Sequence, residues 1–198
     1  DLRRALWQLT NTLLPVLGIW IGLYFLKDFS LWLCIPPAML AGLFLIRAFI
    51  IFHDCGHGSF FKSKKANDAL GFFTGMLTFT PYHHWKWEHA MHHATNGDLD
   101  RRGIGDVWTL TVEEYLTSSR WIKLSYRFLR NPFVLFLIAP LFLFFVLERI
   151  PSSKAKPREK RSVYLMNFAL LLWSVAMSMI YGFVPWLVIQ VAMMAVAG

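Results

Sequence analysis

Long stretches without a charged residue set the strongest limit on how this chain can fold. Residues 5–26 carry no charge, residues 29–52 carry only Arg47, and residues 162–198 carry none. A helix rises 1.5 Å per residue, so about 20 apolar residues cross a hydrocarbon core about 30 Å thick. Hydrophobic residues make up 56% of the 198 residues, which is too apolar for an ordinary soluble domain. The sequence therefore predicts an all-α, polytopic membrane protein.

The apolar pattern predicts about four spans in one domain covering residues 1–198. The first two spans are residues 5–26 and 29–52, and the last two are residues 163–181 and 184 onward, with a turn in YGFVPW between them. The segment ALGFFTGMLTFTPY is apolar but short, which favours a re-entrant or interfacial helix. The segment VEEYLTSSRWIKLSYRFLRN mixes aromatic and basic residues, as an interfacial helix does.

Residues 133–147 leave two topologies open, because they are only fifteen apolar residues with Pro140 among them. If this segment crosses the membrane, the basic loop ERIPSSKAKPREKRS lies outside, against the positive-inside rule. If the segment only re-enters, that loop stays inside, and we favour this arrangement. Arg3, Arg4 and the histidine region then share the cytosolic side, and we expect a bacterial inner membrane.

The charged residues fit membrane topology better than nucleic-acid binding. Ten of the twenty Lys and Arg residues lie between positions 53 and 132, and six more between 148 and 162, so they flank apolar spans. A nucleic-acid-binding face would interleave cations with aromatic residues on an exposed surface. The two cysteines, Cys34 and Cys55, indicate no disulfide framework, and we expect Cys55 to pack in the interior.

All seven histidines fall between positions 53 and 93. This clustering points to a functional site that is built from histidine side chains. His53 and His57 are four residues apart in HDCGHGSF, so on a helix they lie about 40° apart and one turn along. His89, His92 and His93 in HAMHH lie within a sector of about 100° on a helix, where two rings share one ion and the third reaches another. Imidazole ligates iron, copper, zinc and nickel, so the residues alone leave the metal open.

Other polar residues near the two motifs have less certain roles. We expect His83 and His84 to form an interfacial cap rather than to bind metal. Asp54 and Glu88 either accept hydrogen bonds from imidazole N–H groups or are solvated. Arg47 either extends toward the polar boundary or pairs with an acid of the site. Three carboxylates follow the second motif and none is assigned a role: Asp98, Asp100 and Asp106.

Two glycines separate the polar residues of the first motif. We expect Gly56 and Gly58 to permit close packing and to end the helix that carries His53 and His57. The chain begins at Asp1 without Met and finishes within an apolar run, so we expect a piece of a longer protein.

In its two motifs, HDCGHGSFF and WKWEHAMHHATNGD, the chain resembles the membrane fatty acid desaturase family, most closely its Δ12 (omega-6) acyl-lipid branch. The resemblance runs from about residue 40 onward. It implies a four-span helical scaffold with cytosolic histidine motifs that bind two irons. It assigns five ligands: His53, His57, His89, His92 and His93. The family has a third motif of H-x-x-H-H type, which this sequence lacks, so we expect these residues alone to be inactive.

The resemblance also implies the reaction, an O₂-dependent insertion of a cis double bond into a membrane-embedded fatty acyl chain. Unactivated C–H bonds offer no acid and no leaving group, so acid–base residues cannot break them and a redox metal must. Two electrons must come from a donor of ferredoxin or cytochrome b5 type. One basic surface either docks such an acidic donor or lipid phosphates, or reflects topology alone: Lys62, Lys64, Lys65, Arg101 and Arg102.

Three alternatives stay open at this point. A related di-iron membrane hydroxylase or ketolase, acting on an alkane, sterol or carotenoid, would use the same ligands. A membrane metal-binding or transport protein would place its ligands along a path within the bilayer, whereas these histidines lie at or beyond span ends. A non-catalytic fragment is the third.

Overall fold

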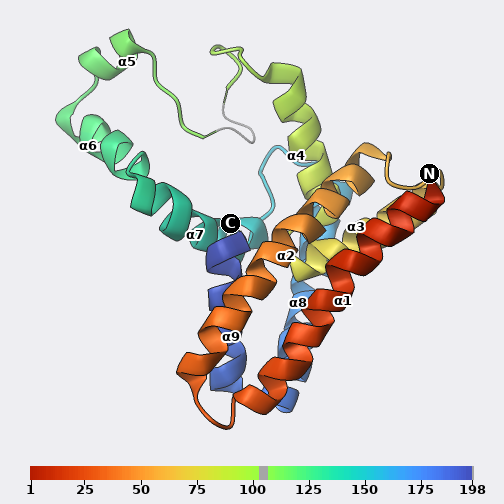
Figure 1. Ribbon diagram of the computed structural model, residues 1–198. Coiled ribbons are helices and arrows are strands. Elements are labelled where there is room, and N and C mark those ends of the chain that lie inside the picture. Colours follow the sequence, from red (N-terminus) through yellow and green to blue (C-terminus); the bar gives the residue numbers. More distant parts are fainter. Residues whose placement is uncertain (103–106, 198) are drawn as a thin grey trace.

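The computed structural model describes residues 1–102 and 107–197, and all regular elements within these ranges are helices (Figure 1). The apolar stretches form two antiparallel hairpins. The four helices are α1 (Leu2–Leu26), α2 (Leu31–His57), α8 (Pro157–Tyr181) and α9 (Phe183–Ala197). Three of them, α1, α2 and α8, are long and apolar enough to cross a membrane. The prediction of an all-α protein with membrane-spanning helices is confirmed.

Both hairpins turn at the same end of the molecule (Figure 1). The α1–α2 turn contains Lys27 and Asp28, whose side chains form an exposed ion pair of 2.7 Å. The α8–α9 turn is made by Gly182, at φ 87°, a left-handed region that favours glycine. This is the turn predicted in YGFVPW. α9 is an apolar helix with 15 described residues.

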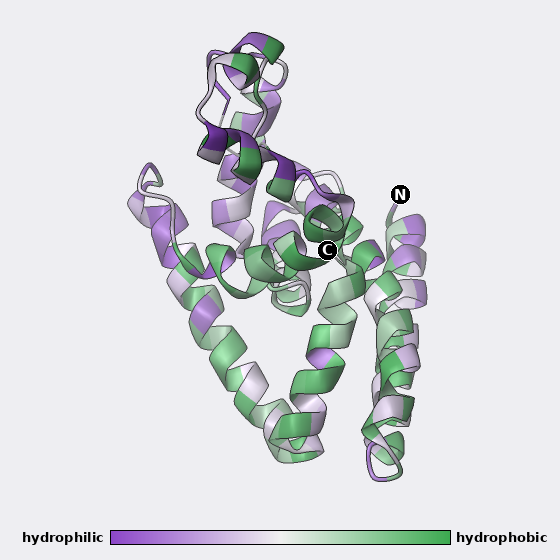
Figure 2. Cartoon of the chain, turned by 90° about the vertical axis from the view of Figure 1, so that its left-hand side faces the viewer, coloured by the Kyte–Doolittle hydropathy of each residue, from purple (hydrophilic) through white to green (hydrophobic). Residues whose placement is uncertain are grey.

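Shorter helices gather at the opposite end, which is also the more hydrophilic end (Figure 2). In chain order they are α3 (Lys64–Leu77), α4 (Tyr82–Thr95), α5 (Val112–Thr117), α6 (Arg120–Leu129) and α7 (Ala139–Phe145), with a π-helical segment over Val134–Ile138 and a 3-10 turn over Leu147–Arg149. The apolar segment predicted as a re-entrant or interfacial helix, residues 69–82, forms the second half of α3 and the turn that leads to the start of α4. The end that carries the polar helices therefore also carries both histidine motifs.

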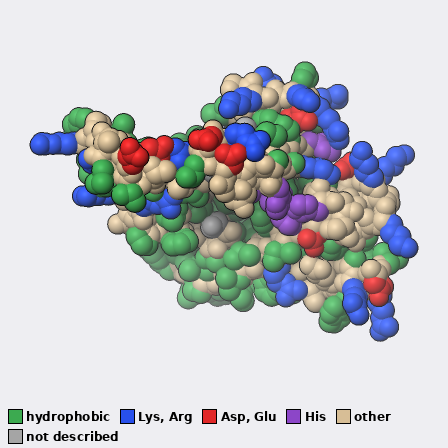
Figure 3. All heavy atoms as spheres, turned by 90° about the horizontal axis from the view of Figure 1, so that it is seen from above, with side chains coloured by type: hydrophobic (Ala, Val, Ile, Leu, Met, Phe, Trp, Pro, Cys, Tyr) green, Lys and Arg blue, Asp and Glu red, His purple; other side chains and the backbone are tan. Residues whose placement is uncertain are grey.

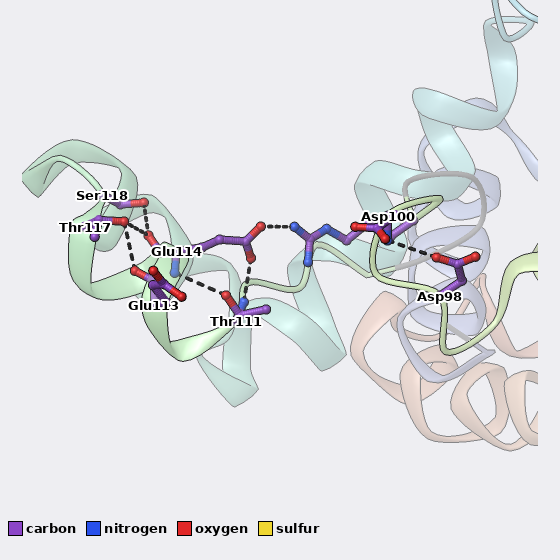
Figure 4. A network of polar contacts seen from close by, with 8 residues as sticks. Asp98, Asp100, Thr111, Glu113, Glu114, Thr117 and Ser118 are labelled. Carbon is purple, nitrogen blue, oxygen red and sulfur yellow. Dashed lines mark hydrogen bonds and ion pairs between the residues drawn. The ribbon is translucent and has the colours of Figure 1, made fainter.

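The predicted interfacial helix over VEEYLTSSRWIKLSYRFLRN is two helices instead of one. Thr111 and Glu114 form a reciprocal capping box at the start of α5 (Figure 4). Ser118 then has an extended backbone, and the Ser119 side chain accepts a hydrogen bond from the Ile122 N–H to start α6. Serine competes for backbone hydrogen bonds in this way, and the prediction overlooked it.

Residues 133–147 follow α6 through a sharp bend. Arg120–Leu129 and Val134–Arg149 together are apolar enough to span, but their axes are bent by 63° at the break between them. A bend of this size fits the favoured re-entrant segment and also fits a broken span. The favoured topology therefore stays a prediction. Within residues 1–102 and 107–197, three helices are long and apolar enough to span, or up to four if this bent pair counts as one span.

α2 is the central helix, because it packs against α1, α3 and α9. One face of α2 carries small buried residues, which let neighbouring helices approach closely: Cys34, Ala38, Ala41, Gly42 and Ala48. At the level of Gly42 the backbone of α9 lies so near that an added Cβ would meet the Met193 carbonyl oxygen at 2.5 Å. Small residues at such crossings are typical of helix packing in membranes.

Gly42→Ala tests this close approach. We expect a loss of about 1–3 kcal/mol in the free energy of unfolding, because backbone of α9 must move to admit the methyl group. Thermal or denaturant unfolding of the detergent-solubilised protein measures it. Gly22→Ala in α1 is the matched control, because a Cβ there meets nothing within 4 Å. Equal stability of the two variants would contradict the packing of α2 against α9.

Candidate metal centre

The two histidine motifs meet where the last turn of α2 lies against α4. His53 and His57 project from α2, which Gly58 ends in a left-handed conformation at φ 72°. His89 and His93 project from α4, one turn apart, toward the first pair. One ring nitrogen from each of the four residues lies within 4.8 Å of the others. Figure 3 shows histidine side chains on this face of the molecule, with hydrophobic side chains beside them.

His89 is the centre of this four-histidine cluster, which we define as His53, His57, His89 and His93. Its Nε2 lies 3.1 Å from Nε2 of His53, 3.2 Å from Nε2 of His57 and 3.0 Å from Nε2 of His93. A ring nitrogen of a neutral imidazole has either one hydrogen or one lone pair in the ring plane. Its one hydrogen or one lone pair can therefore make at most one well-directed hydrogen bond, and the other two close approaches are left without one.

A cation between the four rings removes this conflict. Nitrogens that bind one ion at about 2.1 Å lie about 3.0–3.4 Å apart in octahedral or tetrahedral arrangements. The three Nε2 separations at His89 fall in or close to that range. The arrangement therefore fits a single ion held by imidazoles, the ligand type that iron, zinc, copper and nickel accept.

The electrostatics of His89 favour the neutral form that binds metal. Burial lowers its pKa to about 4, and the neighbouring rings of His53, His93, His57 and His92 add to the effect. Only a neutral imidazole has a lone pair to offer, so a low pKa keeps the ligand available across the physiological range.

His92, the fifth predicted ligand, stands apart from the cluster. Its ring centroid lies 6.3 Å from that of His89 and 6.0 Å from that of His93, and its side chain is half-buried. The helical spacing predicted two rings on one ion and a third reaching elsewhere. The structure groups His89 and His93 with the first motif and leaves His92 on the adjoining face of α4.

Trp85 supports the cluster, and the sequence reasoning missed it. Its ring stacks on the His89 imidazole, with centroids 4.4 Å apart and planes 15° from parallel, and packs at 4.7 Å from Phe52. It reaches this position because Gly56 has no side chain, since a Cβ there would meet the Trp85 ring at 2.9 Å. The available signal was Trp85 four residues before His89, on the same helical face.

Gly56 and Gly58 thus do what the sequence predicted, one by admitting a neighbour and the other by ending the helix. Cys55 is fully buried, as expected, and its backbone carbonyl accepts a hydrogen bond of 2.7 Å from the Tyr82 hydroxyl. Burial raises the pKa of Tyr82, so this hydroxyl stays protonated and continues to donate. The bond fixes the start of α4 on the end of α2.

His83 and His84 lie outside the cluster and fasten α4 to the segment around the start of α8. The Ser152 N–H donates to Nε2 of buried His84 at 3.1 Å, and the His83 N–H donates to the Ser162 hydroxyl at 3.0 Å. Burial lowers the pKa of both imidazoles. Arg149 adds a further tie, because it donates to the Phe79 carbonyl and, at 3.1 Å, to Asn167 Oδ1 of α8.

The carboxylates near the motifs do not enter the cluster. Asp54 Oδ1 is 3.5 Å from His53 Nδ1, a weak contact beside a partly exposed side chain. Glu88 Oε2 is 3.5 Å from His84 Nδ1, and burial raises the pKa of Glu88. Asp98 pairs with Arg101 at 2.6 Å and accepts from the Asp100 N–H at 3.0 Å. Asp106 lies outside the described residues.

The predicted basic surface is only partly free. Arg101 is paired with Asp98, and Arg102 is paired with Glu114. Lys62, Lys64 and Lys65 are exposed at the start of α3. Two of the five cations thus have a carboxylate partner within the protein, which reduces the charge left for a docking partner.

Comparison with known proteins now decides the family. The sequence model described as fatty acid desaturase matches residues 30–198, which include both histidine motifs and the four-histidine cluster. The chain belongs to the fatty acid desaturase family. This confirms the resemblance read from HDCGHGSFF and WKWEHAMHHATNGD.

Curated members of the family are similar over much of the chain. A fatty acid desaturase of Bacillus subtilis is 42% identical over 198 residues, which are 100% of this chain and 56% of that protein. An sn-1 acyl-lipid omega-3 desaturase (ferredoxin) of Synechocystis is 29% identical, over 85% of this chain and 46% of that protein. An sn-1 oleoyl-lipid 12-desaturase of the same organism is 34% identical, over 52% of this chain and 29% of its own length. The chain thus spans about half the length of these relatives or less, and no solved structure matches it.

Gly56→Ala tests the support that Trp85 gives to His89. The new methyl group should push the Trp85 ring away and weaken Co(II) or Zn(II) binding by about tenfold, the smaller effect expected when a residue that orients a ligand is disturbed. Equilibrium dialysis of the purified protein measures the affinity. The double variant Gly56→Ala with Trp85→Leu relieves the clash but lacks the stacked ring, so it should also bind weakly. Full affinity in the double variant would contradict a role for Trp85.

Proposed function

We propose that this desaturase-family chain carries part of the metal centre of an O₂-dependent, di-iron fatty acyl desaturase that inserts a cis double bond into an acyl chain in the membrane. The four-histidine cluster is the observation that carries the proposal, because it gathers imidazoles from two motifs at the C-terminal end of α2. The proposed ligands are His53, His57, His89, His92 and His93. Membership of the family supports the substrate class and the reaction.

The number of histidines determines how the proposed ligands are assigned to the two ions. Four imidazoles suffice for one ion, and in this proposal His53, His57, His89 and His93 hold it. His92 lies on the adjoining face of α4 and is assigned to the second ion. The curated relatives are longer than the region matched here, and the proposal assigns the remaining ligands of the second ion to that further part of the protein.

Iron bound there supplies, with O₂, the oxidation that acid–base side chains cannot perform on an unactivated methylene group. The residues of this chain hold and orient it. His89 is kept neutral by burial and by its neighbours, and Trp85 fixes the plane of its ring. Tyr82, His84 and Arg149 hold α4 so that its histidines face those of α2.

The position of the cluster suits a reaction whose substrate comes from the lipid and whose electrons come from the aqueous side. Apart from Lys27 and Arg47, all Lys and Arg residues fall in segments at the histidine end, so the positive-inside rule supports a cytosolic site in a bacterial inner membrane. The substrate tail then comes from the bilayer, and the electrons come from the aqueous side. Ferredoxin appears in the names of the omega-3 desaturases of Synechocystis and of Helianthus annuus, which favours it over cytochrome b5 as the donor.

Lipid analysis tests the proposal. The protein is expressed from its complete coding sequence in a bacterial host, and its fatty acids are examined by gas chromatography and mass spectrometry. We expect new cis double bonds in aerated cells and none without O₂. His89→Ala should lower the product at least a hundredfold, because it removes the ring at the centre of the cluster.

His83→Ala is the matched control, because it removes a histidine of the same helix that lies outside the cluster, and it should retain most of the product. Hydroxylated or keto products in place of double bonds would replace the desaturase with the related hydroxylase or ketolase. An unchanged lipid profile in a strain with stable, iron-loaded protein and a ferredoxin supply would overturn the proposal.

A further inference from the structure

Arg47 is a charged residue on an otherwise apolar, exposed face of α2. It lies in α2, six residues before His53, and its side chain is exposed. The neighbours on the same face of α2 are apolar and exposed as well, with Leu43 at 52% and Ile50 at 48%. On a membrane-spanning helix such a face contacts lipid, so the guanidinium group has lipid for a neighbour.

The guanidinium group is held in place by α1, which lies beside α2 (Figure 1). Its Nη2 donates to Asn11 Oδ1 at 2.6 Å, and its Nε donates to Thr12 Oγ1 at 3.4 Å. The Thr12 hydroxyl hydrogen is already donated to the Gln8 carbonyl at 2.7 Å, so its oxygen is free to accept. These bonds fix the group at the α1–α2 groove.

Both of these partners are neutral, so the positive charge is not compensated within the protein. In residues 1–102 and 107–197, no carboxylate lies within ion-pair distance of Arg47. An unpaired charge in a membrane span is costly, and such a residue is a candidate functional site. Because its charge is positive, the partner that would compensate it is an anion.

The depth of Arg47 identifies the anion. α2 starts at Leu31, beside the turn at the far end of the hairpin, so Arg47 lies about 24 Å along the helix from that start. A hydrocarbon core is about 30 Å thick, which places the guanidinium group near its opposite edge. The anions found at that level are the phosphate groups of glycerophospholipids, and arginine binds phosphate with two parallel hydrogen bonds.

We propose that Arg47, supported by Asn11 and Thr12, forms a binding site for the phosphate of a glycerophospholipid in the groove between α1 and α2. The acyl chains of this lipid lie along the exposed apolar residues of the two helices, which include Leu14, Leu43 and Leu40. The site does not depend on the metal centre, so it stands apart from the proposed reaction. It places a phospholipid about 9 Å along α2 from His53.

Native mass spectrometry of the detergent-solubilised protein tests this site. Phosphatidylglycerol is the probe, and diacylglycerol with the same acyl chains is the comparison without phosphate. We expect phosphatidylglycerol to bind at least tenfold more tightly than diacylglycerol. Arg47→Gln should abolish that preference, because the lipid phosphate loses its hydrogen bonds to the charged guanidinium group. Lys64→Gln, which removes an exposed cation of α3, is the matched control and should leave it unchanged.

Asn11→Leu is the second variant, because it keeps the arginine and replaces a polar residue of α1 with one suited to a span. We expect its phosphatidylglycerol affinity to fall by about fivefold, since the guanidinium group loses an anchoring hydrogen bond. Equal binding of phosphatidylglycerol and diacylglycerol by the unmodified protein would overturn the proposal. So would an equal loss of binding in Lys64→Gln and Arg47→Gln, which would show attraction to surface charge in general.

Discussion

The crowding of three imidazole nitrogens around Nε2 of His89 is the constraint on which the rest of the structure depends. Lone pairs that meet at about 3 Å repel unless a cation lies between them, so the cluster is stable only when α4 is held firmly against α2. The contacts that hold α4 in place are distributed along the helix. Tyr82 bonds the backbone of α2, Trp85 fills the space left by Gly56, and His84 accepts from the segment before α8.

The hairpins explain why the proposed metal ligands are at one end of the protein. Both hairpins turn at the far end with short loops, which leaves the other end of α2 free to run past its neighbours (Figure 1). The last turn of α2 therefore carries histidines just beyond the hydrocarbon level, while its middle is packed through small residues such as Ala41 and Gly42. In the proposed membrane arrangement, a rigid helix thus carries the four-histidine cluster to the level where acyl chains meet water.

Much of this could be predicted from the sequence because the signals are local. Uncharged runs mark the spans, the i,i+4 spacing brings His53 and His57 to one face, and Gly58 ends their helix. What escaped prediction depends on pairs distant in sequence. The stacking of Trp85 needs Gly56, and Arg47 binds Asn11 instead of the acid that was one of its two predicted alternatives. Its extension to the polar boundary stays a prediction. The break at Ser118 was a local signal that was overlooked, and the separation of His92 follows from how α4 rotates against α2.

X-ray absorption at the metal edge is the most direct test of the central claim, that imidazoles from both motifs hold one ion. The purified protein is loaded with a single equivalent of Co(II) or Zn(II) and its extended fine structure is recorded. The account predicts a nitrogen shell at about 2.0–2.1 Å with the outer-shell scattering of about four imidazole rings. A shell dominated by oxygen, or scattering from no more than one or two rings, would contradict the convergence of α2 and α4 on one ion.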